Sequence, residues 1–277
     1  MTRRRALVEE LRKLPAFFRR DLLVLLSYKT AVWTDWIGLL INLVTFSFVG
    51  RLVDPSRLPQ FGGSRATYLQ FVAVGIATSG FVQVALGQVM AAVRNEQLMG
   101  TLEALMMTPS APATLQLGFV TFDMVYVPFR TSLFLVMAHF LFHLGFDLSG
   151  FGPAAAVMLA LIPVVWGLGV VSAAGVLTFR RGGAVTGFAG AALTMTSGAY
   201  FPLDVLPNWL EAVARLNPVA IALGAARNAL LGHAGWSGIV PTLLKLAPMA
   251  AISLLAGGLA FRLALRRERR LGTLGLY

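Results

Sequence analysis

Four ionisable residues fall inside or beside long apolar stretches of this 277-residue chain, namely Asp35, Asp123, Arg130 and Lys245. Charged side chains are costly within a bilayer, and those that occur there commonly mark an ion or substrate path. Asp35 and Lys245 lie near the ends of their apolar stretches, where we expect them to act as anchors that reach water or headgroups. Asp123 and Arg130 lie deeper and are separated by about 10.5 Å along a helix axis. We expect these two to face the protein interior, where they either line a path or pair with other helices.

Two histidines that are four residues apart, His139 and His143, would share one face of a helix and could bind a metal ion. Apart from Asp147, no carboxylate or third histidine is near them in the sequence, and they fall at the end of an apolar stretch. We therefore interpret both as interfacial histidines and predict no metal site.

Motifs that would make the chain an enzyme are missing from its sequence. None of its lysines, Lys13, Lys29 and Lys245, stands in the Gly-x-x-x-x-Gly-Lys-Ser/Thr motif that cradles nucleotide phosphates. The Gly-x-Ser-x-Gly and His-Glu-x-x-His motifs of hydrolases do not occur, and the absence of cysteine excludes thiol catalysis and disulfides. We predict no catalytic residue and no cofactor in this chain.

The elements that position these residues must be membrane helices. Hydrophobic residues make up 57% of the chain and charged residues only 13%, which is more apolar surface than a soluble core of this size can bury. Strand alternation typical of an outer-membrane barrel is absent, and each helical crossing needs about 20 apolar residues. We predict an all-α integral membrane protein that forms one domain over residues 1–277. Its six transmembrane helices are expected at residues 31–52, 68–92, 113–142, 153–178, 184–203 and 239–262.

Basic residues indicate the orientation of the helices and account for the net charge of +11. They cluster before the first span and after the last, so the positive-inside rule places both termini in the cytoplasm. On this topology the outward segments hold only Arg51, Arg57, Arg65, Arg215 and Arg227. The basic residues form no patch interleaved with aromatic side chains, so we predict no nucleic-acid partner.

Residues 1–28 have apolar side chains at spacings of three and four, opposite charged ones. This pattern predicts an amphipathic interfacial helix, interrupted near Pro15, that either anchors in lipid or docks onto a cytoplasmic partner.

The segment of residues 198–238, between spans five and six, is too short and too polar for another crossing. Its most apolar part, residues 218–231, has fourteen residues and contains Arg227, whereas a crossing needs about 20. Prolines recur along the segment and interrupt a continuous helix. We predict short re-entrant outer helices here.

Two segments resemble parts of the ABC-2 type transporter permeases. The loop of residues 94–112 resembles the cytoplasmic coupling segment of that family at Glu96, Gly100, Thr101, Leu102 and Glu103. The sequence from Ser197 to Leu210, continued by Asn217-Pro218 and Arg227, resembles the outer region of the drug- and lipid-exporting branch.

This resemblance implies the membrane-spanning permease subunit of an ATP-driven exporter that moves a drug-like or lipid-like amphipathic substrate out of the cytoplasm or inner leaflet. It implies a multi-pass protein of the inner, cytoplasmic membrane. The implied partners are a second permease subunit, in a homodimer or heterodimer, and two copies of an ABC ATPase, which would hold ATP and Mg. The coupling residues named above would contact that ATPase. The implied outer gate consists of Tyr200, Phe201, Pro202, Leu206, Pro207 and Trp209.

A different class of function is an ion-coupled secondary transporter that uses Asp35 or Asp123 as a proton site. The inverted repeats frequent in such carriers are not visible in this sequence. An adjacent ATPase and vanadate-sensitive transport would distinguish the exporter from the carrier. The sequence does not identify the substrate.

Overall fold

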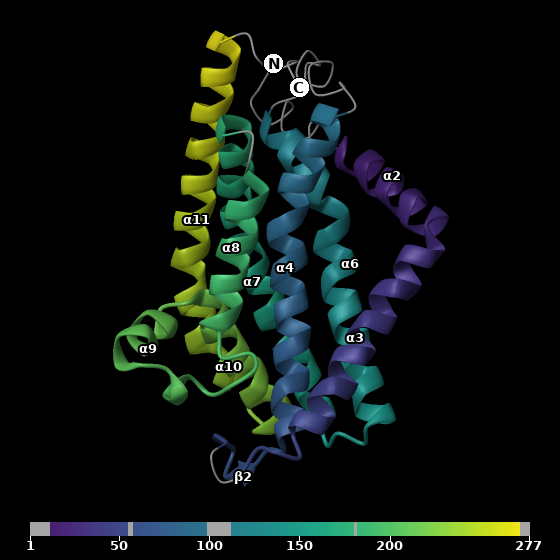
Figure 1. Ribbon diagram of the computed structural model, residues 1–277, viewed down its shortest axis with the longest axis vertical. Coiled ribbons are helices and arrows are strands. Elements are labelled where there is room, and N and C mark those ends of the chain that lie inside the picture. Colours follow the sequence, from purple (N-terminus) through teal and green to yellow (C-terminus); the bar gives the residue numbers. More distant parts are fainter. Residues whose placement is uncertain (1–11, 55–57, 99–111, 180–181, 272–277) are drawn as a thin grey trace.

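The computed structural model describes residues 12–54, 58–98, 112–179 and 182–271 of the chain, and most of these residues are helical (Figure 1). The long helices are α3 (Lys29–Val49), α4 (Tyr68–Leu98), α6 (Pro112–Leu141), α7 (Phe151–Phe179) and α11 (Trp236–Leu271). The shorter ones are α2 (Leu14–Ser27), α8 (Gly182–Met195), α9 (Asn208–Arg215) and α10 (Pro218–Leu231), with the 3-10 turns η2 (Leu148–Gly150) and η3 (Leu203–Val205). Strands β1 (Gln60–Phe61) and β2 (Ser64–Arg65) form a small antiparallel hairpin in which Gln60 pairs with Arg65.

In the described residues, four helices are long and apolar enough to cross a membrane. They contain the stretches Val32–Val49, Thr121–Leu141, Leu148–Gly175 and Trp236–Arg267, and the stretches Tyr68–Val84 and Pro218–Leu231 are apolar but shorter. These helices support the predicted class of an all-α membrane protein. The six-crossing topology stays a prediction.

Five of the six predicted spans correspond closely to α3, α4, α6, α7 and α11, but the fifth does not. A continuous helix was expected over residues 184–203, whereas α8 ends at Met195. Hydroxyl groups compete for the last carbonyls of the helix, because Thr196 Oγ1 donates to Ala192 O at 2.7 Å and Ser197 Oγ donates to Thr194 O at 2.6 Å. Gly198 then takes a φ of +72°, which ends the helical geometry.

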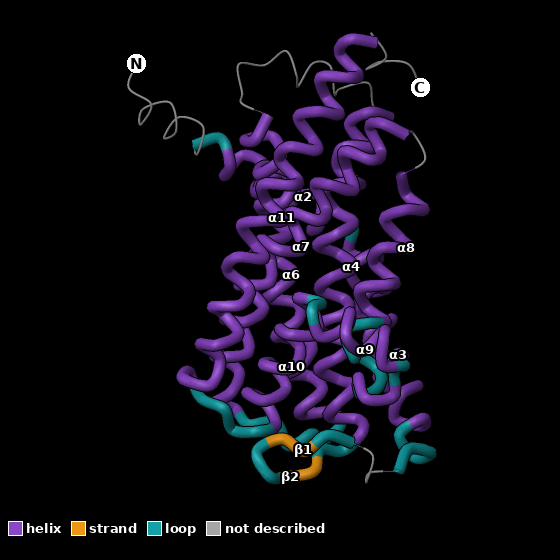
Figure 2. The backbone as a smooth tube through the Cα atoms, turned by 90° about the vertical axis from the view of Figure 1, so that its left-hand side faces the viewer, coloured by secondary structure: helices purple, strands orange, loops and turns teal. Residues whose placement is uncertain are grey.

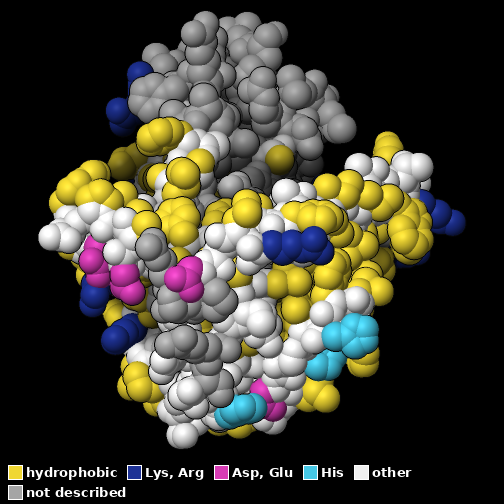
Figure 3. Space-filling model, turned by 60° about the horizontal axis from the view of Figure 1, so that its bottom comes forward, with side chains coloured by type: hydrophobic (Ala, Val, Ile, Leu, Met, Phe, Trp, Pro, Cys, Tyr) yellow, Lys and Arg dark blue, Asp and Glu magenta, His cyan; other side chains and the backbone are white. Residues whose placement is uncertain are grey.

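The helices run between two ends of the molecule (Figures 1 and 2). The end of α10, the 3-10 turn η2 and the β1–β2 hairpin lie together at one end, which we call the hairpin end. The opposite end contains the C-terminal ends of α4, α7 and α11 and the N-terminal ends of α6 and α8. Figure 3 looks onto the hairpin end, where acidic and histidine side chains are visible while hydrophobic side chains cover much of the flanks, as lipid contact requires.

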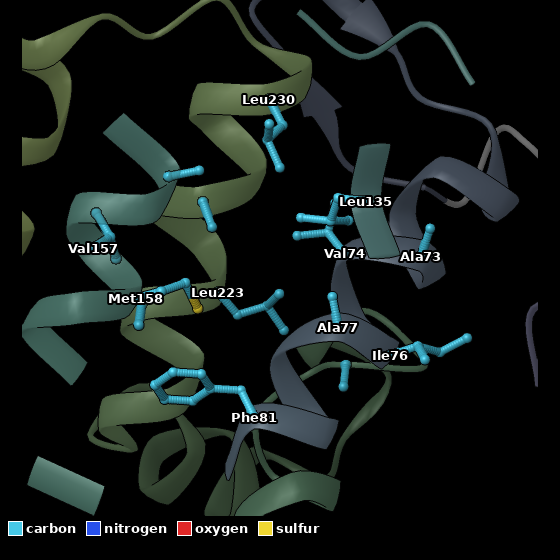
Figure 4. Close-up of a cluster of buried hydrophobic side chains, with 14 of the residues drawn as sticks. Ala73, Val74, Ile76, Ala77, Phe81, Leu135, Val157, Met158, Leu223 and Leu230 are labelled. Carbon is cyan, nitrogen blue, oxygen red and sulfur yellow. The ribbon is translucent and has the colours of Figure 1, made fainter. Parts of the chain in front are cut away.

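The core lies where α4, α6, α7 and α10 meet. Figure 4 shows Phe81 and Val74 of α4, Met158 of α7 and Leu223 of α10 directed into the same cluster, and each is at most 6% exposed. Nine of the fourteen residues of α10 are buried. The short helix is thus a central packing element of the bundle.

Helices α7 and α11 approach each other closely because glycines line their contact. A Cβ on Gly167 of α7 would lie 2.4 Å from the carbonyl carbon of Ser253 on α11, and one on Gly257 would lie 2.6 Å from Gly167 O. Small residues at such crossings allow the helix backbones to touch, which drives helix association in lipid.

Helices α2 and α3 lie at the periphery of the bundle (Figure 1). Helix α2 begins at Leu14 with Pro15 in its first turn, close to the predicted interruption. It packs on α6 through Phe17, whose ring occupies the space above Gly118, and through Phe18, which contacts Phe122. Only 6% of the apolar stretch Val32–Val49 of α3 is buried, as expected of a helix in contact with lipid or another subunit.

Candidate functional site at the 196–207 turn

The turn of residues 196–207, which connects α8 to α9, contains most of the predicted outer-gate residues. Asn217, the N-cap of α10, holds the two ends of this region together: its Nδ2 donates to Leu193 O at 2.8 Å and to Thr196 Oγ1 at 2.9 Å. Its Oδ1 accepts from the N–H of Val219 at 2.8 Å and so caps α10. The chain therefore leaves α8, passes through α9 and returns beside the end of α8.

Arg227 on α10 is the main polar contact of the turn. It was expected in an outward-facing segment, but the structure buries it to 5% exposure. Its Nη1 donates to Gly198 O at 2.9 Å and its Nη2 to Ala199 O at 3.0 Å. Its Nε and Nη2 also donate to Phe71 O of α4, at 3.2 and 2.9 Å. The fork geometry of a guanidinium allows one side chain to bind carbonyls of two separate segments.

Two further contacts join α4 to the same turn. Gly75 lies against the backbone of Ala199 so closely that a Cβ would be 1.9 Å from Ala199 O. About two turns before it, the hydroxyl of Tyr68 donates to Tyr200 O at 3.2 Å. The ring of Tyr200 stacks on Phe46 of α3, with 5.2 Å between centroids. The turn is thus fixed against α4 on one side and touches α3 on the other.

The prolines of this region begin helical turns. Pro202 precedes η3, Pro207 precedes α9 and Pro218 is the first residue of α10. Proline lacks an N–H and has a fixed φ, so it fits the first turn of a helix without loss of a hydrogen bond. Trp209 in α9 is 71% exposed, which suits a side chain at the lipid headgroups. Short helices therefore occur where the re-entrant region was predicted.

Three of the four ionisable residues within or beside the apolar helices, Asp35, Asp123 and Arg130, lie close enough to Tyr126 of α6 to act on it electrostatically. Arg130 is 5% exposed and its Nη2 donates to Oδ1 of Asp35 at 2.6 Å, so α6 is paired with α3. Asp35 was interpreted as an anchor, and the structure gives it this interhelical partner instead. Asp123 is half-buried on α6, and Lys245 is exposed on α11.

His139 and His143 do not share a helix face, because α6 ends at Leu141 and His143 lies beyond it with a φ of 50°. His139 and His233 take part in local contacts near the hairpin end. His139 packs on the rings of Phe140 and Phe146. His233 contacts Oδ2 of Asp147 through Nδ1 at 2.8 Å. Among the residues that the structure describes, no group of three or more His, Asp or Glu side chains could hold a metal ion.

Most of the predicted coupling residues lie outside the described residues. Helix α4 continues to Leu98 and so includes the backbone of Glu96. Gly100, Thr101, Leu102 and Glu103 fall in the range 99–111, which the structure leaves undescribed. What the structure does establish is that the segment before them is the direct continuation of the helix that contacts the 196–207 turn.

Comparison with known proteins identifies the family. The sequence matches the ABC-2 type transporter membrane family over residues 13–231, which is most of the chain and includes α2 through α10. This chain belongs to the ABC-2 type transporter family. As an ABC-2 membrane domain it is a permease component of an ABC transporter, and not the ATPase. The sequence matches none of the curated proteins with which it was compared.

Sequence reasoning missed the role of Arg227 in this ABC-2 permease. The available signal was a single arginine within fourteen otherwise mostly apolar residues of α10. An arginine in such a helix is costly to bury unless it finds partners, and so indicates an internal contact. Its carbonyl partner in α4 is 156 positions away in the sequence, and nothing local predicts it.

Proposed function

We propose that this ABC-2 permease is the membrane-spanning subunit of an exporter that moves an amphipathic, lipid-like or drug-like substrate out of the cytoplasm or inner leaflet. The observation that carries the proposal is the break in helical structure between α8 and α9. Non-helical backbone at membrane depth is tolerated only where protein or a cavity covers it. Here Arg227 and Asn217 satisfy the freed carbonyls of Leu193, Gly198 and Ala199, so a non-helical segment is stable beside the bundle and could serve as a movable gate.

The proposed transporter contains two permease subunits, as a homodimer, and two ATPase subunits that hold ATP and Mg. Both termini of the permease would be cytoplasmic, with its six spans in the inner membrane. Residues Glu96, Gly100, Thr101, Leu102 and Glu103 would contact the ATPase. Nucleotide binding would move this segment, and the 196–207 turn at the far end of α4 would open or close toward the outside.

The decisive experiment compares the permease alone with the permease in complex with its copurified ATPase. In proteoliposomes, we expect the permease alone to hydrolyse no ATP and the complex to hydrolyse it in a vanadate-sensitive manner. The complex should also move a fluorescent phospholipid analogue or a fluorescent amphipathic cation with the same vanadate sensitivity. Substantial hydrolysis by the permease alone, or ATP-independent movement driven by a proton gradient, would refute the proposal.

A substitution at Gly100 tests the coupling segment within the same assay. A close contact between the segment and the ATPase leaves little room for a side chain, so Gly100→Leu should impair vanadate-sensitive transport while the protein still inserts into the membrane. Gly87→Leu is the control, because a Cβ at Gly87 of α4 would meet open space. Equal transport by both variants would argue against the coupling role.

A further inference from the structure

We propose that α4 is the mechanical link between the ATPase-coupling segment and the 196–207 turn, and that Arg227 is the positioning residue that fastens the turn to α4. This inference rests on the proposed function, because it assumes that nucleotide-driven movement begins at the coupling segment. It adds to that function a specific path through the molecule and a residue on which the path depends.

The continuity of α4 is the first argument. Its 31 residues form a single helix from Tyr68 to Leu98, which at 1.5 Å per residue is about 46 Å long. Proline and Gly/Ser pairs are the main sequence causes of sharp kinks in helices. Helix α4 contains no proline but does contain Ser79-Gly80, and it is nevertheless one uninterrupted helix. A displacement at the Leu98 end, where the coupling segment begins, is therefore carried to the Tyr68 end.

The second argument is that the far end of α4 holds the turn at three successive places. The hydroxyl of Tyr68 donates to Tyr200 O, Phe71 O accepts from Arg227, and Gly75 touches the backbone of Ala199. These residues are three and four positions apart and so lie on one face of the helix. Over its first two turns, this face of α4 contacts residues 198–200 and the guanidinium that binds them.

The third argument concerns the kind of partner that Arg227 has. All its hydrogen bonds go to backbone carbonyls, two from the turn and one from α4, and among the described residues no carboxylate pairs with it. The guanidinium also lies over the ring of Phe71, at 3.4 Å from the centroid. Removing the side chain would break the hydrogen bonds to both segments at once while the apolar packing of α10 remains.

Packing alone does not require an arginine at this position. Eight of the other residues of α10 are already buried, so the apolar packing of the helix does not depend on this side chain, whereas the carbonyls of Gly198 and Ala199 would lose their donor without it. Lysine cannot reproduce the contacts, because a single ammonium lacks the planar fork that reaches two segments. The arginine therefore holds the turn in register with α4 in addition to any contribution to stability.

The test uses the cysteine-free chain in complex with its copurified ATPase, with one cysteine introduced at Val205. Val205 lies in η3 within the turn and is 72% exposed. In lipid nanodiscs, where both faces of the membrane are accessible, the rate at which a maleimide labels this cysteine is measured with and without Mg-ATP and vanadate. We expect a several-fold change in the wild-type background. Arg227→Lys and Arg227→Gln should abolish that change while vanadate-sensitive ATP hydrolysis continues.

Arg215→Gln is the matched control. Arg215 is an exposed arginine of the neighbouring α9, and its hydrogen bonds go to Glu211 of the same helix. This variant should retain the nucleotide-dependent change. If neither Arg227 variant yields a folded complex, Tyr68→Phe tests the link in their place. It removes only the hydroxyl that binds Tyr200 O and should weaken the nucleotide dependence of labelling.

Two results would overturn the link through α4. One is labelling of Val205→Cys that depends on nucleotide as fully in the folded Arg227 variants as in the wild type. If those variants do not fold, the same result in Tyr68→Phe would count equally. The other is a wild-type complex that moves the fluorescent phospholipid analogue with vanadate sensitivity while labelling of Val205→Cys is unaffected by nucleotide. That second result would leave the proposed function intact. Vanadate-insensitive movement by the wild type would instead refute the proposed function, and the link with it.

Discussion

The guanidinium of Arg130 on α6 and the carboxylate of Asp35 on α3 form an ion pair with a 2.6 Å hydrogen bond between Nη2 and Oδ1. The arginine side chain is 6% exposed and the aspartate side chain 46% exposed. The pair neutralises a charge that α6 would otherwise bury alone. It also attaches a peripheral helix that has few buried residues of its own.

Breaking this pair from the aspartate side should destabilise the protein. We expect Asp35→Ala to lower the free energy of unfolding by about 1–3 kcal/mol, less than the roughly 3–5 kcal/mol of a fully buried pair because Asp35 is half-exposed. The double variant Asp35→Ala/Arg130→Leu should recover most of the loss, since it leaves no unpaired charge. Thermal unfolding in detergent, followed by tryptophan fluorescence, measures both. An Asp35→Ala midpoint equal to that of the wild type would contradict the role assigned to the pair.

Gly167 should tolerate no side chain, because α11 lies against it. The Cβ of Gly167→Ala would be 2.4 Å from the carbonyl carbon of Ser253, and such overpacking typically costs about 1–3 kcal/mol. Gly175→Ala on the same helix is the control, since its Cβ meets open space and alanine favours a helix over glycine by about 1 kcal/mol. We expect the thermal midpoint to fall for the first variant and to stay or rise for the second. The reverse order would mean that α7 and α11 are not in close contact.

The contact between Asp147 and His233 should make stability depend on pH. Hydrogen bonds from His233 and Ser149 hold the pKa of Asp147 below its ordinary value of 3.8. The stabilisation is therefore present above pH 3.8 and is lost as the pH falls through the lowered pKa of the folded state. The thermal midpoint of the wild type should exceed that of Asp147→Asn above pH 3.8, and the difference should disappear once the pH is below the lowered pKa of Asp147 in the folded state.

Two variants sharpen the pH experiment. His233→Asn removes the imidazole and keeps a residue type that tolerates the positive φ of 53° at this position. His233→Asn should reduce the difference in thermal midpoint that Asp147→Asn causes above pH 3.8. Asp204→Asn, at an exposed aspartate of η3, should not. A pH-independent difference between the wild type and Asp147→Asn would show that the carboxylate of Asp147 is not the titrating group.

Cysteine labelling tests the predicted topology. Asn208 in α9 and His233 after α10 are exposed, and both are expected outside the cell, whereas Leu271 at the end of α11 is expected in the cytoplasm. In intact cells, an impermeant maleimide should label single cysteines at the first two positions and not at the third. If Asn208→Cys and His233→Cys label from opposite sides, the segment between α8 and α11 crosses the membrane and the six-span topology is wrong.

Apolar runs in the sequence predicted most of the helices. Contact with lipid sets the length and composition of a membrane span, and both can be read from one continuous segment of the chain. The span predicted from residue 68 coincides with the first residue of α4, and the span predicted at 113–142 differs from α6 by a single residue at each end. Backbone groups in a bilayer must bond within their own segment, so an apolar run of sufficient length leaves few choices other than a helix. The short helices after α8 were likewise predictable from the length of the segment and its prolines.

Only the tertiary structure decided where α8 ends and which partners the charged residues take. The sequence of residues 184–203 favours one apolar helix, but the helix stops at Met195, and Gly198 and Ala199 give their carbonyls to Arg227. The partners of Arg227 and Arg130 in the earlier helices are 156 and 95 positions away, respectively. A charged side chain in a low-dielectric interior is stable only with a partner at hydrogen-bond distance. Which group supplies that partner depends on the packing of distant helices, which hydropathy along the chain does not encode.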